Sequence, residues 1–579
     1  MRRLCLPFRA PVKGLGIPFS LFSPRLLGML FLLVILGFFT LYPLGMIVYG
    51  GFRSAAPGLP GHFTLSGYIE GFSDPTIIQA LWNTFSLAIV RSIVTTVLAV
   101  FFCWIIVRTD TPFKGLLEVL MWINFFIPGF PMAMGWILLM DPSYGLFNQW
   151  LMKLPLIDSP VFNIYSFWGI VWAHLPFSVS VRVLMFAPAF RNMDVALEES
   201  ARMSGASNLG TLVRITFPLL LPAIIGTTML GFIRSLESFE IELLLGMPAR
   251  FFVFSTKVYD LLRWEPPQYP PAMALSSVFL LVVVGLVFLN RWVIQRRQYT
   301  TVSGKGYRVS PVHLGRWRYA TLAFVILYAI VFLFLPFTVL IIGTFMKVSG
   351  MFNLPDPYTL EHWKVVLQDP VFIRSCINSL IVCVSAALGG MTIFSFLSYI
   401  NIRTKLPGRG LLDFMSWLPW AVPGLLLAVG LLWVFLGGVP FLKALYGTVF
   451  ILIIAMIVSQ LPMGVRVMDG TMVQINQELE ESARMSGANW LHTFRCIMMP
   501  LLMPTYVSTS VIIFLAAIRD IAIVVLLYSP KSRVLSILML EQYIGMSPEK
   551  GMVVGLIITM ICVAVAVIAR TLGMGIRSR

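Results

Sequence analysis

Long uninterrupted apolar stretches run through the whole of this 579-residue chain. A stretch of about 20 apolar residues can cross a hydrocarbon core ~30 Å thick, where only helices or closed barrels can pair all their backbone groups. Hydrophobic residues make up 58% of the chain and charged residues 12%, against about 25% charged in soluble domains. The sequence therefore predicts an all-α polytopic membrane protein. Its expected spans lie near 26–50, 83–107, 116–140, 165–187, 216–236, 273–295, 319–346, 377–401, 411–436, 445–466, 500–519 and 551–573.

The basic residues indicate how these spans are oriented. A net charge of +17 could suggest a nucleic-acid partner, but Lys and Arg also gather in the cytoplasmic loops of membrane proteins. The loop 291–318 alone contains seven of them, and it faces the cytoplasm if both chain ends do. The first apolar stretch is too long for the core of a secretory signal, so we expect a retained helix. We predict a multi-pass protein with both termini inside, and attribute the excess charge to orientation, with no nucleic acid bound.

The cysteines and histidines show no pattern of a structural site. The six cysteines are scattered, no C-x-x-C occurs, and the five histidines are dispersed. Neither a disulfide framework nor a zinc site is indicated.

The chain contains an internal duplication. The nonapeptide EESARMSGA occurs at 198–206 and again at 480–488, an offset of 282. Upstream matches recur at an offset of 295, and the difference is expected mostly in the loop 141–165. Each half then contributes six spans in the same orientation, which predicts two homologous halves related by a pseudo-two-fold axis along the membrane normal. We expect a first half at 1–290, a linker at 291–318 and a second half at 319–579. The upstream matches pair Asn83 with Asn378, Arg108 with Arg403, Gly115 with Gly410 and Pro128 with Pro423.

Both copies of the nonapeptide fall between the fourth and fifth spans of their half, on the predicted inner side. The residues from 194 and from 474 are good helix formers, and a glycine follows at Gly205 and Gly487, where a helix end can adopt a positive φ. A proline, Pro218 or Pro500, then opens the next span. Each copy is thus expected to be a short surface helix. It could simply cap the bundle, or it could bind a partner.

The spacing of these residues resembles a known signature. Glu199-Ser200-Ala201, three residues, Gly205, nine residues, Ile215, two residues and Pro218 recur from Glu481 to Pro500. The pattern resembles the EAA signature (198–218 and 480–500) of the permease subunits of binding-protein-dependent ABC importers. Serine replaces the middle alanine in both copies. The fused twelve-span organisation is similar to ferric-iron permeases, with thiamine and aminoethylphosphonate permeases as related types.

The resemblance implies that the two surface helices are coupling helices in a bacterial inner membrane protein. Each would dock on one of two copies of a cytoplasmic ATP-binding subunit, which would carry ATP and magnesium, while a periplasmic or extracellular binding protein delivers a small solute. This chain has no P-loop, so we expect a transport subunit without an ATPase site or cofactor of its own. The residues implied in coupling are Glu198, Glu199, Ala201, Arg202, Gly205, Glu480, Glu481, Ala483, Arg484 and Gly487.

Ionisable residues cluster at equivalent places after the fifth span of each half, with apolar sequence on both sides. Such groups cost about 2.5 to 3.5 kcal/mol each at the centre of a span, so they require an explanation. Arg234 with Glu237 and Arg519 with Asp520 could form ion pairs beside a re-entrant apolar segment, or the groups could line a passage between the halves. Three carboxylates against one favour a cationic or metal-like cargo, although no metal ligands are assigned. The candidate path residues are Arg234, Glu237, Glu240, Glu242, Arg519 and Asp520.

Three further expectations concern the spans and the class of protein. The Pro128-Gly129 and Pro423-Gly424 pairs are expected to break the third span of each half. Arg91, whose counterpart is Ala386, is expected to snorkel or to form a pair. The alternative function is a twelve-span secondary transporter, and a membrane-embedded enzyme is a third class, although no catalytic constellation is evident.

Overall fold

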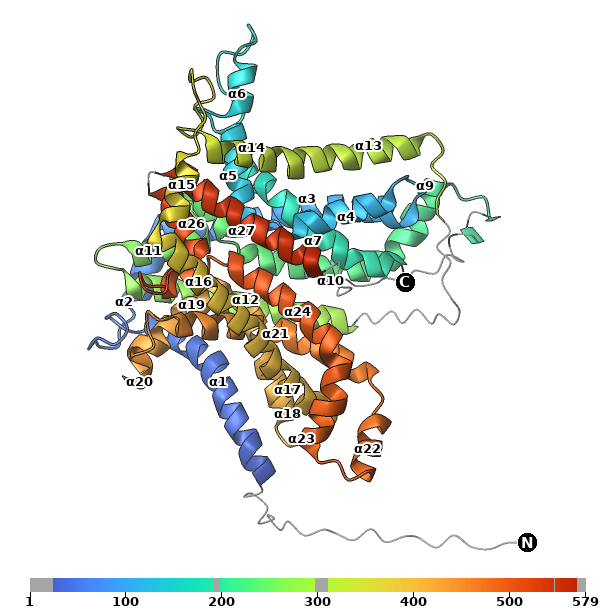
Figure 1. The fold of residues 1–579 in the computed structure, drawn as a ribbon, viewed down its shortest axis with the longest axis vertical. Helices are drawn as coiled ribbons and strands as arrows, with labels where there is room; N and C mark the ends of the chain where they lie inside the picture. Colours follow the sequence, from blue (N-terminus) through green and yellow to red (C-terminus); the bar gives the residue numbers. More distant parts are fainter. Residues whose placement is uncertain are drawn as a thin grey trace, which may run out of the picture.

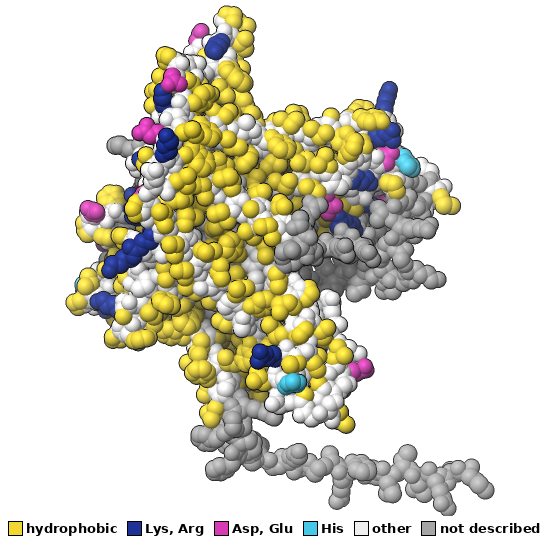
Figure 2. Space-filling view, in the orientation of Figure 1, with side chains coloured by type: hydrophobic (Ala, Val, Ile, Leu, Met, Phe, Trp, Pro, Cys, Tyr) yellow, Lys and Arg dark blue, Asp and Glu magenta, His cyan; other side chains and the backbone are white. Residues whose placement is uncertain are grey.

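A computed structural model describes residues 24–191, 198, 200–201, 203–296, 311–438, 440–545 and 547–569. Within these ranges, ten unbroken helical segments are long and apolar enough to span a membrane, and two bent helix pairs bring the total to twelve. Apolar side chains cover most of the visible helical surface, and charged side chains gather near the ends of the helices (Figure 2). The predicted all-α polytopic fold is confirmed.

The spans of the first half follow the predicted order. Their bounds are α1 (Pro24–Gly51), α3 (Pro75–Arg108), α4 (Lys114–Phe126) with α5 (Gly129–Met140), α7 (Phe167–Arg191), α10 (Phe217–Leu236) and α12 (Tyr269–Arg296). The second half repeats them as α13 (Trp317–Ala329) with α14 (Leu335–Phe345), α16 (Pro370–Val384) with α17 (Gly390–Arg403), α18 (Arg409–Trp417) with α19 (Gly424–Trp433), α21 (Val449–Gln474), α24 (Met499–Arg519) and α27 (Pro548–Ala569).

The third span of each half is broken where the sequence predicts it. The axes of α4 and α5 meet at 98°, and the corresponding helices of the second half meet at 112°. Pro128 and Pro423 are the residues immediately before α5 and α19, in extended conformation. A proline cannot donate the backbone hydrogen bond that would continue the preceding helix. The short helices after the breaks are almost fully buried, so these segments form the core between the halves.

The first span of each half packs on the opposite half. Helix α1 contacts α18 and α19, the broken third span of the second half. Reciprocally, α13 contacts α4, and α14 contacts α5. This exchange follows the pseudo-two-fold relation expected from the duplication.

Short helices follow the fifth span and return the chain toward the sixth span. In the first half these are η3 (Glu242–Gly246), η4 (Met247–Ala249) and α11 (Phe254–Arg263), and in the second α25 (Val524–Leu527) and α26 (Leu535–Ile544). Leucines 243–245 are between 0% and 4% exposed, so the apolar stretch is packed inside the protein.

The repeated polar residues of the second span cap these returning helices. The Thr84 hydroxyl accepts a hydrogen bond from the first backbone N–H of α11 (2.7 Å), and the Ser379 hydroxyl does the same for α26 (2.7 Å). Asn83 and Asn378 donate to carbonyls in the segments just before or at these helix starts. The repeated Asn-Thr and Asn-Ser pairs therefore satisfy backbone groups at equivalent helix ends.

The remaining short helices lie at the ends of the spans. They are α2 (Ser66–Ser73), α6 (Leu146–Leu151), α15 (Glu361–Gln368) and α20 (Pro440–Lys443) at one end, and α9 (Asn208–Thr211), α22 (Glu478–Met485) and α23 (Trp490–Thr493) at the other. The end that carries α9 and α22 is called the signature end below. Figure 1 shows the helices of the two halves diverging toward this end, with α9 at the tip of one arm and α22 at the tip of the other.

Candidate functional site

The two copies of the nonapeptide lie at the tips of the two arms. In the first copy Met203, Ser204 and Gly205 are exposed, while Glu199 and Arg202 lie outside the described residues. In the second copy α22 presents Glu481, Arg484 and Met485 to the surface. The equivalent methionines are each 89% exposed. An exposed methionine is an adaptable apolar contact for a partner, so the tips have the chemistry of a docking surface.

The glycine after each helix adopts the backbone conformation that its position requires. Gly205 has φ of +87° and Gly487 has φ of +85°, values that residues with a Cβ rarely adopt. Ala201 and Ala483 are partly buried, and their carbonyls accept the backbone N–H of residues 206 and 488. The two copies therefore fold alike wherever both are described.

Glu198 and Glu480 differ from the expectation that they contact a partner. Their side chains are each 3% exposed and point into this chain. Glu198 pairs with Arg108 and accepts a hydrogen bond from the Thr216 hydroxyl (2.5 Å). Glu480 pairs with Arg403 at 3.1 Å. The first glutamate of each copy is therefore internal, because a buried arginine at the end of the second span holds it.

The charges after the fifth span of the first half form one pair, between the exposed Arg234 and the buried Glu237 side chain, and place one carboxylate at the contact between halves. Arg234 Nη1 donates to Glu237 Oε2 at 2.9 Å, and the Arg234 guanidinium lies 5.8 Å from the ring centroid of Trp420 in the other half. Glu240 Oε1 accepts a hydrogen bond from the backbone N–H of Ile521 at 3.4 Å. Both Arg234 and Glu240 thus contact the second half.

Arg519 reaches in the opposite direction. Its Nη1 donates to the Phe125 carbonyl at 3.2 Å, and the guanidinium lies 5.8 Å and 5.3 Å from the ring centroids of Phe125 and Phe177. Phe125 and Trp420 are equivalent by the repeat offset of 295 (420 minus 125). Each half therefore places an arginine on the same aromatic position of the other half, an arrangement called the aromatic latch below.

The structure does not contain the predicted Arg519–Asp520 ion pair. Asp520 Oδ1 instead accepts the backbone N–H of Ile523, the residue just before the short helix α25, at 2.8 Å. Arg519 ends α24 and its side chain extends toward the first half, so the neighbouring carboxylate is left to the backbone. The carboxylates of Glu240 and Asp520 belong to adjoining segments of opposite halves, because Glu240 contacts the residue that follows Asp520.

Glu242 does not face the contact between halves. It is fully buried and accepts from His174 Nε2 (2.9 Å), Arg91 Nη1 (3.3 Å) and the Ser238 hydroxyl (2.7 Å). This closed network corrects the expectation that Glu242 lines a passage, because all its polar contacts come from the first half. Arg91 forms a pair, one of the two roles predicted for it.

Sequence reasoning missed four contributors. Arg108 and Arg403 were visible as matching residues of the repeat, but their ion pairs depend on the folding of distant segments. His174 lies within the fourth span, where an ionisable group is itself a signal. Arg182, also within that span, is 4% exposed, and its Nη2 lies 3.4 Å from the Ser92 hydroxyl.

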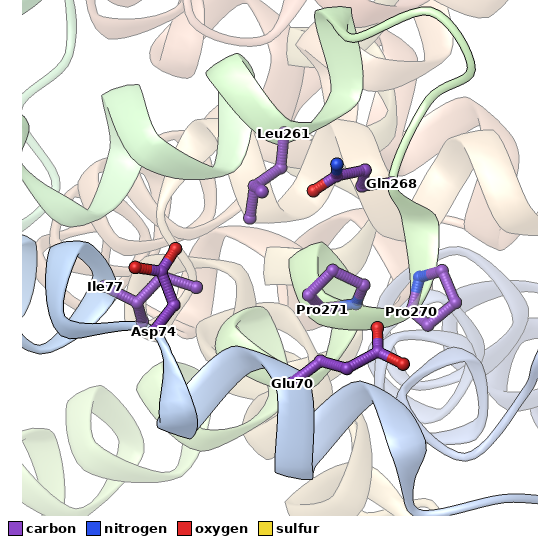
Figure 3. Close-up of a pocket in the computed structure, with 7 residues that line it drawn as sticks. All are labelled: Glu70, Asp74, Ile77, Leu261, Gln268, Pro270 and Pro271. Atoms are coloured by element: carbon purple, nitrogen blue, oxygen red, sulfur yellow. The ribbon is translucent and has the colours of Figure 1, made fainter.

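The described residues contain no group of three or more His, Cys, Asp or Glu side chains placed to hold a metal ion. A separate cavity of about 250 Å³ lies at the end opposite the signature end. Figure 3 shows the carboxylates of Glu70 and Asp74 on the side formed by α2 and the start of α3, with α11 and the start of α12 on the other side. Its lining residues are Glu70, Asp74, Ile77, Leu261, Gln268, Pro270 and Pro271.

Comparisons with known proteins relate parts of this chain to membrane components of transport systems. Residues 391–576 match the family described as binding-protein-dependent transport system inner membrane component. The probable ABC transporter permease protein y4fN of Sinorhizobium fredii is 26% identical over 505 residues, 86% of this chain and 88% of that protein. The ferric transport system permease protein FbpB of Actinobacillus pleuropneumoniae is 28% identical over 64% of this chain and 53% of that protein. The Fe(3+)-transport system permease protein FbpB 2 of Haemophilus influenzae is 24% identical over 85% of this chain and 90% of that protein.

Proposed function

We propose that this chain, a permease of the binding-protein-dependent ABC importer type and a non-catalytic transport component, forms the translocation path of an importer for a small cationic solute. Ferric iron is the favoured cargo, because two relatives described as ferric permeases resemble it. The single observation that carries the proposal is the exposed signature surface at the tip of each arm (Figure 1).

The two signature helices suit a pair of like partners. Two copies of an ATP-binding subunit present the same groove twice, so one chain needs two similar signature helices to dock in them. In this proposal the signature end is cytoplasmic, with the chain termini on the same side, and the binding protein docks at the opposite end. A partner moves the halves only if it binds the signature helices differently in its ATP-bound and nucleotide-free states.

The path lies between the halves, next to the aromatic latch. The helices diverge toward the signature end (Figure 1). Arg234 and Arg519 connect the two halves through their contacts with Trp420 and Phe125. Glu240 and Asp520 place carboxylates from both halves at this contact, which favours a cation. A transit site must bind its cargo weakly enough to release it, and two carboxylates without a full set of metal ligands meet that requirement.

Co-purification tests the proposed partner. The chain is expressed with a candidate ATP-binding subunit from the same organism, and the complex is isolated through a tag on this chain. We expect stoichiometric ATPase in the wild type and its loss when Glu199 and Glu481 are both replaced by Arg. The matched control is Glu361→Arg, which reverses an exposed glutamate at the opposite end. Retention of the ATPase by the double variant would contradict the assigned docking surface.

Uptake in a deletion strain tests the cargo and the class of transporter. Labelled ferric iron, thiamine and aminoethylphosphonate are compared in cells that carry or lack this chain. Uptake that needs the ATP-binding subunit supports the importer, and the cargo that is lost on deletion is the substrate. Uptake that persists without nucleotide and stops when the proton gradient is collapsed would establish the secondary transporter instead.

A further inference from the structure

We propose that Arg108 and Arg403 are positioning residues that tie each signature helix to the second span of its half. Each holds the first glutamate of a signature copy in a buried ion pair, so that a movement of the surface helix moves the span. This inference rests on the proposed function, since it concerns how binding of the ATPase to the signature helices is transmitted to the translocation path.

In the first half the ion pair joins three elements. Arg108 is the last residue of α3 and is 1% exposed. It pairs with Glu198, whose other carboxylate oxygen accepts the hydroxyl of Thr216, the residue just before α10. The carboxylate of the signature therefore links the end of the second span to the start of the fifth.

In the second half the same pair has different neighbours. Arg403 is the last residue of α17 and pairs with Glu480 at 3.1 Å. The Tyr399 hydroxyl, one turn earlier in α17, donates to Glu480 at 2.8 Å. Arg403 also donates to the carbonyls of Met472 (2.9 Å) and Ile475 (2.5 Å) at the end of α21. Here the ion pair and its hydrogen bonds connect the signature helix to the second and fourth spans.

The two ion pairs occupy equivalent places in the duplication. Arg108 and Arg403 are separated by 295 residues (403 minus 108), and Glu198 and Glu480 by 282 (480 minus 198), the two offsets that align the halves. The hydroxyl partners are not equivalent, since Thr216 aligns with Met498 and Tyr399 with Trp104. The shared element is therefore the arginine–glutamate pair itself.

Burial separates the task of these glutamates from that of their neighbours. Glu481 is exposed on α22 and remains available to a partner, and the exposed Arg484 lies 3.8 Å from Glu480, which is itself enclosed. A buried charge has no replacement for its partner from water, so the pair resists separation when the helix is displaced. The exposed residues of the signature bind the partner, and the buried glutamate transmits the displacement of the signature helix to the second span.

The backbone beside Arg108 is fixed from a second direction. The Arg108 carbonyl accepts the N–H of Val312 at 2.7 Å, and the Asp110 carboxylate accepts the N–H of Leu314 at 2.9 Å. The end of the linker thus holds the end of α3. Because this backbone is held by the linker, a displacement carried through the ion pair can move the span rather than only its end.

The test measures cargo transported for each ATP hydrolysed, in proteoliposomes that contain the complete transporter and its binding protein. The variants are Arg108→Gln, Arg403→Gln, and the exchange Arg108→Glu with Glu198→Arg. The matched controls are Glu118→Gln and Asp413→Asn, which remove the half-exposed pairs with Arg191 and Arg466 at the same end of the molecule.

We expect both glutamine variants to retain the ATPase on purification and to hydrolyse ATP, while the cargo transported per ATP falls about tenfold or more, within the usual range of a coupling free energy. The exchange should restore most of this ratio, and the controls should keep it. A purely structural role would lower assembly and hydrolysis together and leave the ratio unchanged.

The outcomes separate this inference from the proposed function. If the wild type holds no ATPase, the proposed function fails. If the wild type is coupled and the folded glutamine variants are coupled equally well, the positioning role is overturned while the proposed function stands. If the glutamine variants do not assemble, the exchange variant provides the test. A folded exchange variant that transports cargo supports the positioning role, and a folded one that hydrolyses ATP without transport overturns it.

Discussion

Replacing Arg519 by Met tests whether the aromatic latch holds the halves together. Methionine keeps an apolar stem of similar length but removes the hydrogen bond to the Phe125 carbonyl and both ring contacts. A hydrogen bond from a charged group contributes about 1.5 to 3 kcal/mol, and each half-buried ring contact about 0.5 to 1 kcal/mol. The gross sum is offset by the cost of removing the guanidinium from water. We therefore expect the variant to weaken the contact by about 2 kcal/mol, or roughly 30-fold in an equilibrium constant.

The separation of the arm tips reports this change without assuming transport. Spin labels are placed at the exposed Cys496 in the second half and at Ser204→Cys in the first, with the other cysteines replaced. Pulsed electron paramagnetic resonance then gives the distribution of distances between the two tips. We expect a broader distribution in Arg519→Met and an intermediate one in Arg519→Lys, because lysine keeps the charge but not the planar group.

Two further variants make the result specific. Arg533→Met removes an ion pair with Glu541 that lies entirely within the second half, and it should leave the tip distances unchanged. Phe125→Leu removes one ring and keeps the carbonyl, so its combination with Arg519→Met should cost less than the sum of the two. Tip distances in Arg519→Met that match the wild type, or strictly additive effects of the pair, would refute the latch.

Four other outcomes follow from the described contacts. Glu242→Gln breaks a buried network around Arg91 and should cost about 3 to 5 kcal/mol of stability, seen as a lower Tm in detergent; an unchanged Tm contradicts the network. Met485→Ser, at an 89% exposed position, should leave Tm unchanged but weaken the affinity for the ATPase in a binding titration. Gly487→Ala should weaken the same affinity, because its φ of +85° costs other residues about 1 to 2 kcal/mol, whereas Gly470→Ala within α21 should not. The hydrogen bond from the Leu314 N–H lowers the pKa of Asp110. The ionised Asp110 therefore stabilises the contact with the linker above the unfolded pKa of ~3.9, and this stabilisation is lost as the pH falls through the folded pKa. Acid should speed proteolysis of the linker in the wild type but not in Asp110→Asn.

The order of spans and their breaks could be predicted because they depend on local sequence. Apolar length fixes a span, and Pro128 and Pro423, each followed by a glycine, mark the breaks in the two third spans. The Arg234–Glu237 pair was also predictable, since residues three apart share one helical face. Features set within about one helical turn are readable from a single sequence.

The contacts between distant segments were not predictable in the same way. Arg519 has a carboxylate as its next neighbour, yet its side chain packs on Phe125 and Phe177, nearly 400 and 350 residues earlier in a chain whose halves meet only after folding. Glu242 likewise depends on Arg91 and His174 from two other spans. Spacing could not distinguish these arrangements from local pairing. The repeated Arg108 and Arg403 carried a usable signal, because a charged residue retained at the same span end in both halves needs a partner.

The two halves are alike at the proposed docking tips and unlike in the buried core of each half. The nonapeptide is identical in both copies, and both copies keep the buried arginine–glutamate pair. By contrast, the network of Arg91, His174 and Glu242 aligns with Ala386, Met456 and Val524 in the second half. In the proposed function two like subunits impose the same requirement on both tips, whereas the buried core of each half has only to satisfy its own packing. The duplicated chain can therefore keep two similar signature tips while its first half alone carries the buried network of Arg91, His174 and Glu242.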